Sequence, residues 1–83
     1  MLTGSQIRAA RGLLGWTSER LAEASGVHYA SISRAEQHDG PPPVRASTLV
    51  AVKAALETGG VVFIEDGVNR PGGVGVRMRE NVT

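Results

Sequence analysis

Few side chains in this sequence have the types and spacing that chemistry on a substrate requires. Cysteine is absent, so disulfides and thiolate metal sites are excluded. His28 and His38 have no third ligand at metal spacing. We find no nucleophile elbow, phosphate loop or paired-carboxylate motif. We therefore expect a protein that is not an enzyme and needs neither a metal nor a cofactor.

The arginines offer a different chemistry, because a guanidinium can bind phosphates and base edges. The net charge is only +1. Its distribution matters more than its sum, and residues 1–34 contain four arginines against two glutamates, whereas residues 57–66 contain three acids and no base. This basic surplus is mild, so charge alone does not establish nucleic acid as the partner.

Four helices are expected to position these arginines. Thr3 and Gln6 have the spacing of a capping box, which predicts a helix through Ser5 to about Leu14. The second helix should lie between a Thr17 cap and Gly26, the third over about residues 28–37, and the fourth over about residues 46–57. Three prolines at 41–43 separate the last two helices.

The end of the chain has a different pattern. Residues 61–64 are β-branched and aromatic, residues 67–75 are rich in glycine, and residues 74–79 alternate between apolar and polar. These patterns predict a hairpin with a long loop, and a hairpin is stable only when it packs on helices or on another chain. We expect residues 1–58 to form one domain and residues 59–83 to form a β-hairpin that makes a homodimer through Val62, Phe63 and Ile64.

The stretch from Thr17 to Glu36 carries the most information. A small residue at Ala22 lets two helices cross closely, Gly26 supplies a sharp turn, and Val27 and Ile32 fill the space between the helices. This is the pattern of a helix-turn-helix, in which the second helix enters the major groove of DNA.

The sequence resembles the Cro/repressor (XRE-type) helix-turn-helix family over residues 1 to about 58. The resemblance rests on Leu21-Ala22, Ser25-Gly26-Val27, Ile32-Ser33-Arg34 and Glu36, with Gly15-Trp16 upstream and Ser47-Thr48-Leu49 and Ala55-Leu56 downstream. It implies a mainly α fold of four helices and a double-stranded DNA operator as the partner.

The resemblance also implies a role for each position. The base contacts would be His28, Tyr29, Ala30, Ser33 and Arg34, and the phosphate contacts would be Arg11, Thr17, Ser18, Ser31 and Arg45. Arg34 matters most, because it can contact guanine O6 and N7 together. Two positions depart from the family: Ser18 stands where glutamine is common, and His28 stands where serine or threonine caps the helix. Because histidine caps poorly, His28 is expected to contact DNA instead.

Several of these residues also have structural interpretations. Glu36 is expected to form a salt bridge within the domain, and Trp16 is expected to fill the core. Arg34 can instead pair with a nearby acid, and Arg77 and Arg79 can either lie in solvent or follow a phosphate backbone.

These observations favour a cytoplasmic regulator, most simply a repressor, that binds an inverted repeat as a homodimer. The alternative is a protein-interaction module, either an antiactivator or an antitoxin, built on the same fold. No apolar run has the length of about 20 residues that a membrane span needs.

Overall fold

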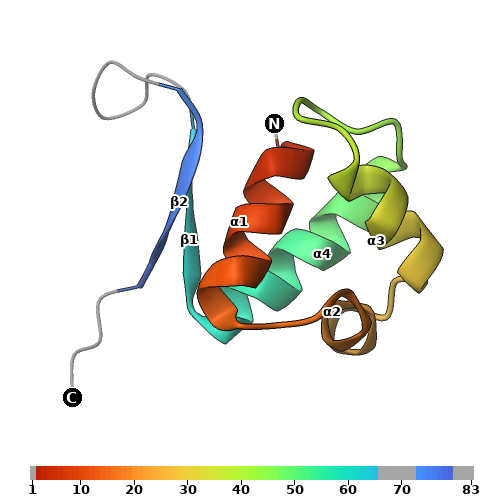
Figure 1. Ribbon diagram of the computed structural model, residues 1–83, viewed down its shortest axis with the longest axis horizontal. Helices are drawn as coiled ribbons and strands as arrows, with labels where there is room; N and C mark the ends of the chain where they lie inside the picture. The colour runs from red at the N-terminus through yellow and green to blue at the C-terminus, as the bar shows by residue number, and fades with distance from the viewer. Residues whose placement is uncertain (1, 66–72, 80–83) are drawn as a thin grey trace.

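The computed structural model describes residues 2–65 and 73–79. These residues form four helices followed by two antiparallel strands: α1 (Gly4–Leu14), α2 (Ser18–Ser25), α3 (Tyr29–Glu36), α4 (Ala46–Gly59), β1 (Val61–Ile64) and β2 (Gly75–Met78). The sheet lies beside α1, on the side away from α2 and α3 (Figure 1). The predicted fold class, mainly helical with a C-terminal hairpin, is confirmed. None of the described helices has the length and apolar character that crossing a membrane requires.

The predicted helix ends agree with the structure to within about two residues. Thr3 and Gln6 form the expected capping box of α1, and Gly15 ends that helix in the left-handed conformation at φ 68°. Thr17 caps α2 through its side chain. Helix α4 extends beyond its predicted end at Glu57, because Gly60, at φ 117°, is the first residue that leaves the helical conformation.

One hydrophobic core lies among the four helices and the first strand. Its buried residues are Ile7, Ala10, Leu21, Ile32, Ala35, Val52, Leu56 and Val61. Leu14, Trp16, Val27 and Leu49 pack against it while partly exposed.

The beginning of α1 lies directly against the end of α3. The Gly4 N–H donates to the Gly40 carbonyl at 3.0 Å. A Cβ atom at Gly4 would lie 1.9 Å from the His38 carbonyl oxygen and 2.3 Å from that of Ala35. Only glycine allows the two backbones to approach this closely.

The hairpin packs on the helices through one face. Val61 pairs with Met78 and Phe63 with Val76, and Val61, Phe63 and Val76 belong to the core or pack on it. Because side chains alternate along a strand, Val62 and Ile64 lie on the opposite face. The second strand is shorter than predicted, since it covers 75–78 rather than 74–79. Residues 67–72 of the predicted loop lie outside the described residues.

Gln6 attaches α1 to the hairpin. Its Oε1 accepts hydrogen bonds from the Thr3 N–H at 2.9 Å and the Thr3 hydroxyl at 3.3 Å. Its Nε2 donates to the Ile64 carbonyl at 3.2 Å and the Gly75 carbonyl at 3.1 Å. The side chain of Gln6 is 4% exposed. One buried amide therefore caps the first helix and fixes the loop end of the hairpin.

Candidate nucleic-acid interface

Helices α2 and α3 are joined by a short turn that Ser25 stabilises. Its hydroxyl donates to the Leu21 carbonyl at 2.7 Å and accepts the Val27 N–H at 3.2 Å. Gly26 takes the left-handed conformation at φ 73°, and its N–H donates to the Ala22 carbonyl at 2.9 Å. Sequence reasoning assigned no role to the Ser25 hydroxyl, although a serine directly before the turn glycine was the available signal.

The inner face of α3 is fixed by the core. Ile32 and Ala35 are buried, and Val27 packs against the core cluster from the turn. The outer face is left to solvent. Among the residues predicted to read bases, His28, Tyr29, Ala30 and Arg34 are exposed, and Ser33 is partly buried. The structure thus places all five predicted base contacts on one short segment and leaves four of them exposed.

His28 differs from its predicted behaviour, because it caps α3. The imidazole Nδ1 accepts a hydrogen bond from the Ala30 N–H at 3.0 Å. The expectation that histidine would leave the capping role was therefore wrong. A deprotonated Nδ1 presents a lone pair as the side-chain oxygen of asparagine does, so it can accept the same N–H.

The predicted phosphate contacts lie in different surroundings. Thr17 and Ser18 stand at the beginning of α2, where its first N–H groups give a local positive potential. The Thr17 hydroxyl already accepts the Arg20 N–H at 3.0 Å. Arg45 is exposed at the beginning of α4, and Ser31 is partly buried on α3. Within the described part of the chain, neither Arg34 nor Arg45 forms an ion pair.

Arg11 is more constrained than the other predicted phosphate ligands. Its guanidinium donates to both carboxylate oxygens of Glu36, at 2.9 and 3.0 Å, and to the Trp16 carbonyl at 3.0 Å. The hydrogen bond to Glu36 raises the pKa of Arg11 above its ordinary value. Glu36 is only 9% exposed. The predicted structural salt bridge of Glu36 is thus confirmed, whereas a phosphate contact by Arg11 stays a prediction.

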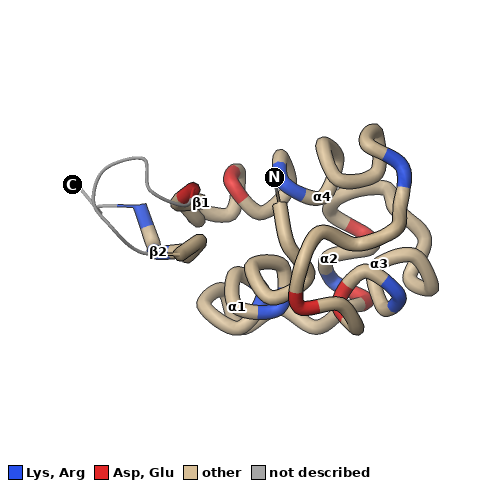
Figure 2. Tube along the Cα trace, turned by 90° about the horizontal axis from the view of Figure 1, so that it is seen from above, with Lys and Arg blue, Asp and Glu red and all other residues tan. Residues whose placement is uncertain are grey.

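A second arginine joins α1 to the same end of α3. Arg8 donates to the Glu36 carbonyl, and it pairs with Asp39 at 2.8 Å. The hydrogen bond from Arg8 lowers the pKa of the Asp39 carboxyl. Over α2 and α3, acidic positions lie among the basic ones, whereas α1 contains only basic positions (Figure 2).

Trp16 fills space at the edge of the core, as predicted. It packs against the core cluster while partly exposed. The Arg20 guanidinium lies 4.8 Å from the centre of its ring, an interaction that the sequence did not predict. Arg20 also pairs with Glu23 at 3.6 Å. This arginine is therefore held against the protein.

Helix α3 is short, is capped by His28 and follows α2 after a turn at Gly26, and both helices pack on a small helical core. This arrangement defines a helix-turn-helix domain. The protein-family model described as "Helix-turn-helix" matches residues 7–52. The chain therefore belongs to this family, of the Cro/repressor type, as its sequence indicated. Helix-turn-helix domains of this type are DNA-binding domains.

Two curated proteins resemble almost the whole chain. Both are named as uncharacterized HTH-type transcriptional regulators, one from Sinorhizobium medicae (strain WSM419) and one from Rhizobium meliloti (strain 1021). Each is 35% identical over 77 residues, which cover 93% of this chain and 54% of the relative. The chain thus spans about half the length of these relatives.

Proposed function

We propose that the protein is a sequence-specific transcriptional repressor that binds an inverted-repeat operator as a homodimer in the cytoplasm. The observation that supports this best is the outer face of α3, where residues with hydrogen-bonding side chains are exposed while the inner face is buried. A helix held in this way can enter a major groove without disturbing the core.

Arg34 is the proposed principal base contact, because it is exposed and forms no ion pair among the described residues. We propose weaker base contacts for the neighbours of Arg34. Tyr29 would pack against a thymine methyl group, Ser33 and Ala30 would lie at base edges, and His28 would contact a base from the beginning of the helix. Phosphate contacts are proposed for Thr17, Ser18, Ser31 and Arg45, and for Arg11 where its pairing with Glu36 allows.

The test is a mobility shift on DNA upstream of the protein's own gene, followed by two substitutions of Arg34. Arg34→Ala should weaken specific binding by about 5- to 150-fold, the equivalent of about 1–3 kcal/mol. Arg34→Lys keeps the charge but loses the bidentate geometry, so it should retain non-specific affinity and lose discrimination. Unchanged binding by both folded variants would refute the assignment of Arg34. Capture of a protein partner without DNA affinity at low salt would favour an interaction module instead.

Salt dependence separates the phosphate contacts from the base contacts. The slope of log affinity against log salt should be about −0.9 for each phosphate neutralised. Arg45→Ala should therefore weaken binding to all sequences alike and reduce the slope by about one. An unchanged slope would remove Arg45 from the interface.

The dimer is proposed to form through the hairpin. Phe63 packs on the protein's own core, so Val62 and Ile64 on the other face of β1 supply the apolar surface for a partner. Binding to an inverted repeat would require the two α3 helices of the dimer to lie on one side of the DNA, about 34 Å apart. Val62→Lys and Ile64→Lys should shift sedimentation from dimer to monomer while the helical circular dichroism stays the same. A dimer unaffected by both would exclude this surface.

A further inference from the structure

The cap of α3 determines which nitrogen of His28 carries a proton. An Ala30 N–H that donates to Nδ1 at 3.0 Å requires a lone pair on that nitrogen. The hydrogen of a neutral imidazole must then reside on Nε2, because the bond made by one ring nitrogen sets the tautomer of the other. The capping bond therefore converts His28 into a group with a single N–H donor at Nε2.

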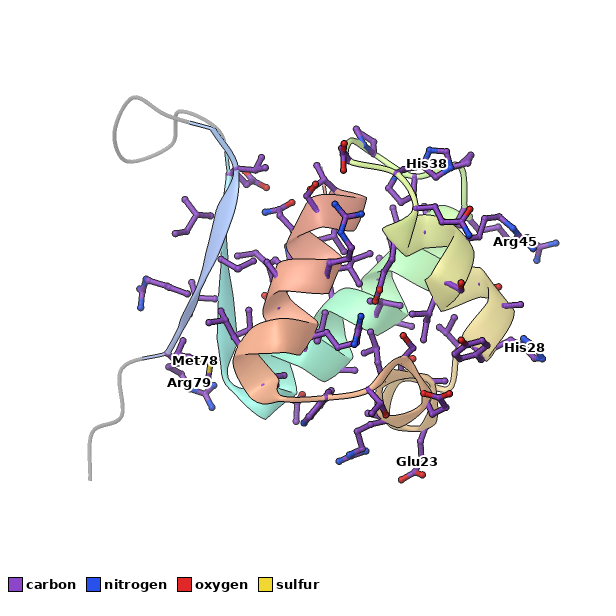
Figure 3. All side chains as sticks on the ribbon, viewed as in Figure 1. Glu23, His28, His38, Arg45, Met78 and Arg79 are labelled. Carbon is purple, nitrogen blue, oxygen red and sulfur yellow. The ribbon has the colours of Figure 1, made fainter. Side chains whose placement is uncertain are left out.

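This donor lies at the exposed beginning of α3. His28 directly precedes α3 and follows the turn at Gly26 and Val27. The side chain is exposed and projects away from the helices at the beginning of α3 (Figure 3). The backbone carbonyl of His28 accepts the Ser31 and Ile32 N–H groups, at 3.0 and 3.3 Å, so the residue is fixed by its main chain as well as its ring.

We propose that His28 reads a guanine in the operator through this single Nε2–H donor. The inference rests on the proposed function, since it requires that α3 enters a major groove. Guanine offers two adjacent acceptors there, N7 and O6, whereas adenine and thymine each offer one acceptor, N7 or O4, and the cytosine edge offers only an N4 donor. A donor without an acceptor of its own meets no partner on the cytosine edge, so cytosine at this position of the contacted strand is disfavoured.

The same side chain thus has two functions that can be separated by substitution. His28→Ser keeps a capping hydroxyl but provides no group that reaches the groove. His28→Asn keeps both, because its Oδ1 can cap while its Nδ2 donates. Asparagine is shorter than histidine, so it should restore only part of the affinity that the contact with guanine provides.

The tautomer can be measured on the free protein. Long-range ¹H–¹⁵N spectra of the imidazole should show an unprotonated Nδ1 and a protonated Nε2. A proton on Nδ1 would overturn the inference without affecting the proposed function.

The base contact is tested on an operator obtained by selection from random DNA. Replacing the contacted guanine by 7-deazaguanine removes N7, and this should weaken wild-type binding by about fivefold to tenfold. His28→Ser should already be weaker by a similar factor and lose nothing more on the modified operator, while His28→Asn should be intermediate.

The possible failures are distinguishable. Deaza substitutions that weaken wild type and His28→Ser equally at every guanine would overturn the role of His28 and leave the proposed function standing. A wild-type protein that selects no DNA sequence would overturn both.

Discussion

Replacing Gln6 by glutamate should release the hairpin while leaving the cap of α1 intact. The carboxylate keeps an oxygen that accepts the Thr3 N–H and hydroxyl. Glutamate is also favourable three residues after a helix cap, both in the capping box and with the helix dipole. The other carboxylate oxygen replaces the donor Nε2, however, and faces the carbonyl oxygens of Ile64 and Gly75. The substitution therefore removes only the hydrogen bonds that hold the hairpin.

The magnitude follows from these contacts. Two hydrogen bonds of about 1 kcal/mol each disappear, and two carbonyl groups face a buried negative oxygen, so the free energy of unfolding should fall by about 2–4 kcal/mol. The site is 4% exposed, which limits the relief that water can provide. For a domain of this size each kcal/mol lowers the midpoint of thermal unfolding by roughly 4–8 °C.

Urea unfolding measures the total effect, and hydrogen exchange locates it. The amides of β1 and β2 should exchange faster in Gln6→Glu, while those of α2 and α3 should change less. The matched control is Thr3→Val, which removes the capping hydroxyl at a cost of about 1 kcal/mol and leaves both Nε2 bonds in place. A glutamate variant with wild-type stability, or with hairpin amides as protected as in the control, would refute the role assigned to Gln6.

Four further substitutions, one of them a control, test the contacts of α1. Gly4→Ala should destabilise by about 1–3 kcal/mol in urea unfolding, because its Cβ would meet two backbone oxygens within 2.3 Å. Gly12→Ala lies in the same helix with open space around it, so it should instead stabilise the fold by up to about 1 kcal/mol. Changes of the same sign in the unfolding free energies of the two alanine variants would contradict this. Glu36→Gln should cost about 1–3 kcal/mol, since it weakens a mostly buried pair with Arg11, and a neutral effect in the same assay would show that the charge is dispensable. Because folding lowers the pKa of the Asp39 carboxyl, its ion pair with Arg8 stabilises the fold at pH values above the ordinary pKa of 3.8. This contribution is lost as the pH falls through the lowered pKa of the folded state. Asp39→Asn should therefore lose less stability than wild type in an acid titration, and parallel curves would contradict that.

The sequence predicted the local features of the fold well, because their signals lie a few residues apart. The capping box of Thr3 and Gln6, the cap at Thr17 and the left-handed Gly15 and Gly26 each depend only on near neighbours. Family resemblance then assigned the exposed face of α3. These are the interactions that propensity and spacing encode.

Contacts between distant residues were not predictable in the same way. The bonds from Gln6 to the hairpin join residues 58 and 69 positions apart, and no local pattern marks them. The resemblance assigns Arg11 to a phosphate contact, and no local pattern marks the pairing of Arg11 with Glu36, which lies 25 residues away. His28 was judged by the average capping preference of histidine, whereas its own ring geometry decides the outcome.

Helix α1 connects the two surfaces on which the proposed function depends. On one side, Arg8 and Arg11 bind the end of the recognition helix through Glu36. On the other side, Gln6 holds both strands of the hairpin, and α1 contacts both strands as well as α3 and α4. If two protomers pair through Val62 and Ile64, the distance between their recognition helices is then set by side chains on this one helix. Gln6→Glu should accordingly reduce operator affinity even where the isolated protomer still folds, because a detached hairpin no longer fixes the spacing of two half-sites.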